Sequence, residues 1–331
     1  EEDRDYYLER RYPAFGNLVP RDVASRAAKE RCDKGYGVNN TGLAVFLDFS
    51  EAINRLGKDV VAQRYGNLFD MYEEITDVSP YENPMMIYPA IHYTMGGIWV
   101  DYELMTSIKG LFAIGECNFS DHGANRLGAS ALMQGLADGY FVLPYTIQNY
   151  LADQITVPRF STDLPEFAAA EKAIQDKIDW MMNIKGKKSV DSIHKELGHV
   201  MWEYVGMGRT AEGLKEGLKR LKEIRKEFEK ELFIPGEKEG MNVELDKAIR
   251  LYDFITMGEL VAYDALNRNE SCGGHFREEY QTEEGEAKRD DENYFYVACW
   301  EYQGSDEKEP VLLKEPLVYE AIKVQTRNYK S

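Results

Sequence analysis

The clearest hydrophobic pattern lies in the second half of the chain. Apolar residues recur there at steps of three and four between residues 214 and 232, separated by Lys and Glu. This spacing predicts an amphipathic helix that buries one stripe of its surface. Helical patterns at residues 165–184, 189–205 and 243–266 predict partners for it, so we expect a three- or four-helix packing unit within residues 151–270.

A different pattern covers residues 86–150. Short apolar runs such as MMIYPAIHY, GGIWVDY and GLFAIGE alternate with Gly, and a long helical pattern then extends from Ala129 to Asn149. Short strands broken by Gly and followed by a helix are typical of an α/β layer that binds a ligand. This segment is therefore expected to hold the chemistry.

The flanking segments are less regular. Residues 1–90 mix polar helical stretches, one of them after Pro20, with a short apolar run, GLAVFLDF, that predicts a buried strand. The helical pattern is lost in residues 271–331, where aromatic residues alternate from Tyr294 to Tyr302. We expect a small β element there, followed by an extended tail.

Composition narrows the possible functions. The 331 residues contain 40 Lys and Arg against 58 Asp and Glu, a formal charge of −18 that disfavours binding to a nucleic-acid backbone. Four scattered cysteines form neither a disulfide framework nor a zinc pattern, so we expect no metal site and a reducing compartment. No uninterrupted apolar run approaches the roughly 18 residues that cross a bilayer.

Several residues could carry chemistry, although each also has a structural interpretation. His92 precedes two glycines in HYTMGG, where a backbone could approach a flat ligand, or a bulge could form. Glu116 ends a strand-like run and Arg126 precedes a helix start, which suits a ribose and a carboxylate, but both could be surface charges. Arg21 follows Pro20 at a helix start, where a simple cap explains the pattern.

Three motifs together are more specific than any one of them. HYTMGGIWVD, GLFAIGE and HGANRLGASAL, in this order and spacing, resemble the C-terminal half of the flavoprotein subunit of succinate dehydrogenase and fumarate reductase. NLVPRDVASRA upstream and ESCGGHFREEY downstream also resemble that family, so the similarity covers nearly the whole chain. The chain opens without Met in EEDRDYYLERRYP, and we expect it to be the second half of a larger flavoprotein.

The resemblance implies an α/β plus α fold. Residues 1–90 would be the C-terminal part of a capping domain, and residues 91–150 the C-terminal segment of an FAD-binding domain. A helical bundle domain would follow at 151–270, and a C-terminal β and tail extension at 271–331. Both of the first two domains are thus expected to be partial.

The resemblance also implies roles for individual residues. In the family a dicarboxylate lies against the flavin, and a hydride passes between the substrate carbon and the flavin. By motif, Arg21 resembles the arginine that transfers a proton, and His92 and Arg126 resemble the pair that holds the substrate carboxylates. Because a guanidinium releases its proton reluctantly, the role of Arg21 implies a strongly perturbed environment or a relay.

Cofactor binding is implied in the same way. Glu116 resembles the ligand of the FAD ribose, and Ala131 and Leu132 resemble positions whose backbone meets the flavin. FAD is covalently bound in the family, and the attachment residue is expected outside this chain. Since the chain contains no GxGxxG fingerprint, we expect it to bind FAD weakly or not at all by itself.

The chain departs from the family pattern at two places. The chain has Ala-Ser-Ala-Leu at 129–132 where the family often has Asn-Ser-Leu, and Cys272 where it commonly has Arg. The implied partners are an iron–sulfur subunit and a membrane anchor subunit, at the cytoplasmic side of the inner membrane. An L-aspartate oxidase shares some of these motifs, and an inactive subunit-interaction module is the other alternative.

Overall fold

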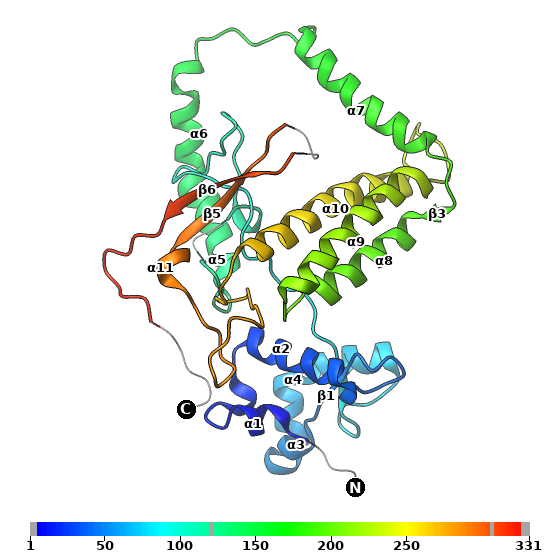
Figure 1. Ribbon diagram of the computed structural model, residues 1–331, viewed down its shortest axis with the longest axis vertical. Coiled ribbons are helices and arrows are strands. Elements are labelled where there is room, and N and C mark those ends of the chain that lie inside the picture. The colour runs from blue at the N-terminus through cyan, green and yellow to red at the C-terminus, as the bar shows by residue number, and fades with distance from the viewer. Residues whose placement is uncertain (1–4, 120–121, 305–307, 326–331) are drawn as a thin grey trace. The chain divides into compact units, whose positions relative to one another are not determined.

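The computed structural model describes residues 5–119, 122–304 and 308–325. The described residues divide into two compact units, residues 5–92 and residues 93–325 (Figure 1). The sequence-predicted boundary near residue 90 lies close to this division.

The first unit is mainly helical. Its helices are α1 (Tyr7–Arg11), η1 (Gly16–Leu18), α2 (Arg21–Arg31), η2 (Cys32–Tyr36), α3 (Ser50–Leu56) and α4 (Lys58–Thr76). Strands β1 (Val45–Leu47) and β2 (Met85–Ile87) pair antiparallel, with Val45 opposite Ile87. The strand expected in GLAVFLDF and the helix expected after Pro20 are therefore both present, the strand as three residues only.

Two small apolar clusters hold this unit together. Val23 and Ala27 of α2 pack with Tyr12 and Val19, and all four are buried. Beside β2, the helix α4 contributes Val61 and Phe69 to a second cluster with Met85. The cores of the first unit are thus local to neighbouring helices and strands.

The second unit begins with a region of loops and helices. These elements are η3 (Gly115–Cys117), α5 (Ser130–Ala137), η4 (Asp138–Val142), α6 (Leu143–Leu151) and η5 (Ala152–Gln154). The last four almost match the long helical pattern expected from Ala129 to Asn149. The strands expected in GGIWVDY and GLFAIGE are reduced to isolated bridges between Ile98 and Asn118 and between Met105 and Phe112.

One glycine explains how these loops come close together. Gly97 lies beside the carbonyl groups of Cys117 and Asn118, and a Cβ atom placed on it would be 2.6 Å from each oxygen. Next to it, the Ile98 amide donates to Cys117 O at 2.9 Å, and the Phe119 amide donates to Ile98 O at 3.0 Å. A side chain at position 97 would therefore separate the two segments.

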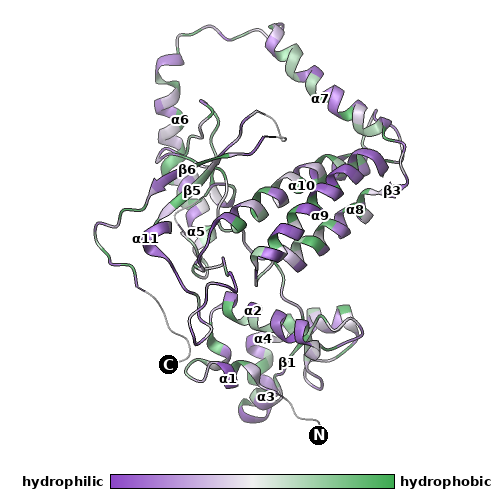
Figure 2. Ribbon diagram, viewed as in Figure 1, coloured by the Kyte–Doolittle hydropathy of each residue, from purple (hydrophilic) through white to green (hydrophobic). Residues whose placement is uncertain are grey.

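A helical bundle forms the largest core of the second unit. It comprises α7 (Pro165–Asn183), α8 (Val190–Val200), η6 (Met201–Val205), α9 (Ala211–Glu231) and α10 (Val243–Asn267), with the short parallel strands β3 (Lys188–Ser189) and β4 (Leu232–Phe233). The apolar stripe of α9 is buried: Leu214, Leu221, Ile224 and Phe228 are each at most 2% exposed. Figure 2 shows hydrophobic and hydrophilic residues alternating along these helices, and the predicted helices are confirmed.

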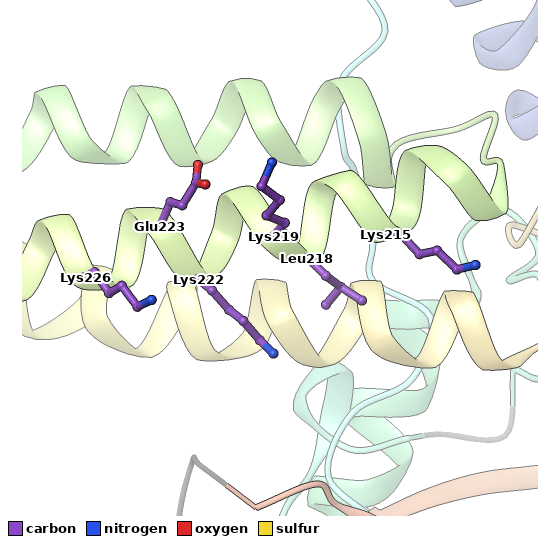
Figure 3. A pocket seen from close by; sticks show the side chains of 6 residues that line it. All are labelled: Lys215, Leu218, Lys219, Lys222, Glu223 and Lys226. Carbon is purple, nitrogen blue, oxygen red and sulfur yellow. The ribbon is translucent and has the colours of Figure 1, made fainter.

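The outer face of α9 carries its lysines. A surface hollow there is lined by Lys215, Leu218, Lys219, Lys222, Glu223 and Lys226 (Figure 3). All six belong to one helix, and Lys219 and Glu223 lie one turn apart. We interpret this hollow as the solvated face of an amphipathic helix.

The chain ends in the expected β element. After α11 (Asp291–Tyr294), strands β5 (Tyr296–Glu301) and β6 (Val311–Pro316) pair antiparallel, with Tyr296 opposite Pro316. Trp300 donates to Asp264 Oδ1 of α10 at 2.7 Å, which ties the hairpin to the bundle. Among the described residues, no helix is both long and apolar enough to cross a membrane.

Replacing Leu221 with Ala tests the bundle core. Leu221 is fully buried between α9 and its neighbours, so we expect Leu221→Ala to lower the free energy of unfolding by about 3 kcal/mol. Urea unfolding followed by circular dichroism measures this loss. Lys222→Ala, at an exposed position on the same helix, should change the value by less than about 0.5 kcal/mol. Equal effects of the two changes would contradict the packing described here.

Candidate functional site

Arg126 is the most unusual charged residue of the second unit. It lies in the loop before α5 and is only 8% exposed. Its Nη1 donates to Leu127 O at 3.1 Å, and its guanidinium carbon lies 4.5 Å from the centre of the Tyr93 ring. Its Nε is buried and has no hydrogen-bond partner within the described part of the chain. A buried guanidinium with a spare donor is suited to bind an anion.

Two aromatic side chains accompany Arg126. The rings of Tyr93 and His122 meet edge to face, with centres 5.7 Å apart. Tyr93 Oη and His122 Nε2 are buried, and neither has a hydrogen-bond partner among residues 5–119, 122–304 and 308–325. Within the described residues, three polar groups in one small cluster thus keep unused hydrogen-bonding capacity. Nothing in the sequence singled out Tyr93 or His122, although Tyr93 stands in HYTMGGIWVD and His122 in HGANRLGASAL.

Glu116 lies in the short turn η3 and is exposed. The backbone amide of Thr94 donates to its Oε1 at 3.4 Å. Since Thr94 follows Tyr93, one short segment contacts both Glu116 and Arg126. Because the side chain is exposed, its other carboxylate lone pairs are accessible to a ligand hydroxyl.

Asp138 holds the Glu116 turn in place, although no motif in the sequence singles it out. This carboxylate is 8% exposed, and its Oδ2 accepts from the Gly115 amide at 3.0 Å, from Gln134 Nε2 at 2.8 Å and from Asn118 Nδ2 at 3.4 Å. Gln134 belongs to α5, and Asn118 directly follows the η3 turn. A buried carboxylate with three donors fixes the backbone beside Glu116. Its signal in the sequence is weak, because Asp138 looks like one more polar residue of a helix.

Ala131 and Leu132 occupy the first turn of α5. The helix starts after Ala129, whose φ of 63° is left-handed, and no side chain caps it. Leu132 is 80% exposed, and Ala131 is half-buried. The free amides of a first turn suit a polar or anionic ring edge. Together with the exposed carboxylate of Glu116, this open helix start fits the requirements of a flavin nucleotide.

Arg21 and His92 belong to the first unit. Arg21 is the first residue of α2 and is exposed, and His92 is the last residue of the unit and is also exposed. The contacts described above, between Arg126 and Tyr93 and between Glu116 and Thr94, lie within the second unit.

The loop after α10 is closed on itself by hydrogen bonds. Ser271 is fully buried; its Oγ accepts from the Arg277 amide at 2.8 Å and donates to Arg277 O at 3.0 Å. The Arg277 guanidinium, 2% exposed, donates to Ala265 O at 3.0 Å at the end of α10. Burial raises the pKa of the Cys272 thiol, so this residue stays protonated at neutral pH. The loop is thus a rigid extension of the helical bundle.

His275 in this loop is held neutral. Arg209 Nη1 lies 2.6 Å from His275 Nδ1, and since arginine can only donate, Nδ1 is the acceptor. His275 Nε2 then carries the hydrogen and donates to Arg268 O at 3.0 Å. Burial and the positive charge of Arg209 lower the pKa of His275 to about 4, and burial lowers the pKa of Arg209 to about 10. The imidazole acts here as a neutral connector.

Removing the Asp138 carboxylate tests its role in the Glu116 turn. In Asp138→Ala the Gly115 amide loses its acceptor, so hydrogen exchange of residues 113–119 should accelerate by about tenfold. Mass-spectrometric exchange on the purified protein measures the change. Asp153→Ala, an exposed acid beyond α6, should leave these amides unaffected. Unchanged exchange in Asp138→Ala would show that the turn does not depend on this carboxylate.

The neutral state of His275 predicts a pH dependence of stability. Its folded pKa of about 4 is below the ordinary value of 6.5, so the unfolded chain takes up a proton first as the pH falls. Between pH 6.5 and 4 this group should remove up to about 3 kcal/mol of stability, and it has no effect above pH 6.5. The drop in Tm from pH 7 to 4.5 should therefore be smaller in His275→Gln than in the wild type.

A second histidine provides the control. His199 is exposed on α8, and His199→Gln should keep the wild-type pH dependence of Tm. If His275→Gln and His199→Gln behaved alike, His275 would not be the group that is held neutral.

Comparison with known proteins places this geometry in context. A family model described as fumarate reductase flavoprotein C-term matches residues 194–329, and one described as FAD binding domain matches residues 9–132. The succinate dehydrogenase flavoprotein subunit of Bacillus subtilis is 34% identical over 83% of this chain and 46% of its own length. The fumarate reductase flavoprotein subunit of Escherichia coli is 31% identical over 85% of this chain and 44% of its own length.

A solved structure agrees with these matches. Sdh1 of Mycobacterium smegmatis, in a complex with UQ1, superimposes with a TM-score of 0.76 at 27% identity, over 96% of this chain and 50% of that one. The chain thus spans about half the length of the relatives it matches. The chain belongs to the family of flavoprotein subunits of succinate dehydrogenase and fumarate reductase.

Proposed function

We propose that the complete protein interconverts succinate and fumarate. The observation that carries this proposal is Arg126, a buried guanidinium stacked on Tyr93, whose Nε donor has no partner among the residues that the structure describes. Its planar fork matches a carboxylate better than an ammonium group would. The chain belongs to a family of flavoproteins whose named members act on these dicarboxylates.

The charge balance of the chain strengthens this argument. With a formal charge of −18, the protein as a whole repels a dianionic substrate. Local positive charge in a buried place must therefore provide the attraction, and Arg126 is buried. Its donor groups would also withdraw electron density through that carboxylate from the conjugated double bond, which favours hydride addition to the double-bond carbon farther from it.

FAD is the cofactor of the family, and when bound it supplies the hydride acceptor and donor. We propose that Glu116 holds its ribose and that the backbone of Ala131 and Leu132 faces its ring. Asp138 keeps the Glu116 turn in a fixed shape through Gly115. Covalent attachment of FAD would use a residue outside this chain.

Arg21 and His92 complete the proposed set of substrate residues. We propose that His92 holds a substrate carboxylate in the complete enzyme, and that Arg21 delivers or removes the proton on the substrate carbon next to the one that exchanges the hydride. Both side chains are exposed within the first unit and are thus accessible to a ligand. Their assignment is supported by the HYTMGG and PRDVASR motifs.

The same proposal assigns the larger parts of the chain. Residues 1–90 would complete a capping domain and residues 91–150 an FAD-binding domain, followed by the bundle at 151–270 and the extension at 271–331. Electrons would pass to an iron–sulfur subunit and then to a quinone through a membrane anchor subunit, on the cytoplasmic side. A solved relative, 27% identical, is a quinol–fumarate reductase described with menaquinol molecules, which supports this assignment.

Assays of the full-length protein with its iron–sulfur subunit test the function. The wild type should reduce fumarate with reduced viologen and oxidise succinate with a quinone analogue. Arg126→Gln should lower kcat/KM for fumarate by about 100-fold or more, because the variant loses its charge-assisted contact to a carboxylate. Arg21→Ala should abolish turnover while the flavin remains bound.

Matched controls make these assays decisive. Arg159→Gln removes an arginine from the exposed connector before α7 and should leave kcat/KM unchanged. Turnover of L-aspartate with oxygen, without turnover of succinate or fumarate, would replace the proposal by an L-aspartate oxidase. Full activity of Arg21→Ala would remove that residue from the proton transfer.

A further inference from the structure

The loop after α10 packs directly against the loop that carries Arg126. The amide of Gly274 donates to Ala124 O at 3.0 Å. Gly273 lies even closer: a Cβ atom on it would be 2.1 Å from Ala124 O and 2.4 Å from the Ala124 carbonyl carbon. Ala124 stands only two residues before Arg126. The backbone of one loop therefore defines where the backbone of the other can lie.

The backbone conformation of Gly273 is a second reason why glycine is needed at this position. Its φ of 59° is left-handed, which glycine adopts without a penalty. The contact with Ala124 is between backbone atoms on both sides, so no flexible side chain can move away to make space. Position 273 thus requires glycine for two independent reasons.

The turn is stiff because its base is fixed to the bundle. The two hydrogen bonds between Ser271 and Arg277 close the loop, and the Arg277 guanidinium is anchored on Ala265 O at the end of α10. His275, the residue after Gly274, is held on both ring nitrogens by Arg209 and by Arg268 O. The turn that contacts the Ala124 carbonyl is therefore fixed to the packed helix α10, so it cannot easily move away from Ala124.

We propose that the Gly273–Gly274 turn is a positioning element that sets the location of Arg126 for substrate binding. The turn supports the Arg126 loop through Ala124, and the Tyr93 ring holds the guanidinium at 4.5 Å. The residues of the turn touch neither substrate nor cofactor in this proposal. The effect on substrate binding rests on the function proposed above, whereas the support of the loop does not.

The substitution Gly273→Ala in the full-length protein with its iron–sulfur subunit tests the proposal. The new methyl group must displace the Ala124 carbonyl, and Arg126 moves with it. We expect KM for fumarate and the inhibition constant of malonate to rise about tenfold or more, with FAD content unchanged. Hydrogen exchange of residues 122–128, measured without substrate, should accelerate.

Gly42→Ala is the matched control. Gly42 has a similar left-handed φ of 67°, but apart from its chain neighbours no described residue has an atom within 4 Å of a Cβ placed there. This variant has the same backbone cost without the collision, so KM, the malonate constant and the exchange of residues 122–128 should stay at wild-type values. Identical results for Gly273→Ala and Gly42→Ala would overturn the proposal.

A milder variant covers the case in which Gly273→Ala does not fold. Ser271→Ala removes the hydroxyl that closes the loop and introduces no collision. It should raise the malonate constant about threefold and accelerate exchange of residues 122–128. Unchanged exchange in this variant would also overturn the proposal. If the wild type turned over no dicarboxylate but exchange still rose in both variants, the proposed function would fail and the support of the Arg126 loop would stand.

Discussion

The candidate site depends on backbone segments that touch without side chains between them. Gly97 allows its loop to lie against the carbonyls of Cys117 and Asn118, and Gly273 allows another loop to lie against Ala124. Each contact places a segment that carries a candidate site residue, Glu116 in one case and Arg126 in the other. Such contacts are short and rigid, and they leave little freedom for the residues beside them. The site is thus built on backbone packing rather than on a continuous sheet.

The helical parts of the fold could be predicted from the sequence, and the loop parts could not. The burial of one side of α9 can be predicted from its sequence, because apolar residues three and four positions apart lie on the same face of a helix. An apolar run such as GGIWVDY becomes a strand only where another edge lies beside it, and here Ile98 finds pairing at a single bridge. The local sequence pattern of a segment does not show whether such a neighbouring edge exists. This is why strands were expected where the structure has loops.

The same distinction applies to the site residues. Arg126 and Glu116 stand in motifs and could be selected from the sequence, although their burial and contacts could not. Asp138 contacts Gly115 across 23 residues, and Gly273 contacts a loop about 150 residues away, so neither interaction leaves a local pattern. Residues that hold a site in shape act through such distant contacts. They remain invisible until the chain is folded.

The energetics of Arg126 connect this architecture with its proposed task. A buried donor without a partner costs about 1–3 kcal/mol, and stacking on Tyr93 offsets only part of the burial of the charge. A structure free to relax would turn the guanidinium toward water and recover its hydration. The support of its loop by the Gly273–Gly274 turn opposes that movement. The free energy of binding a carboxylate is then not reduced by the cost of ordering the Arg126 side chain, because the fold already holds that side chain in place.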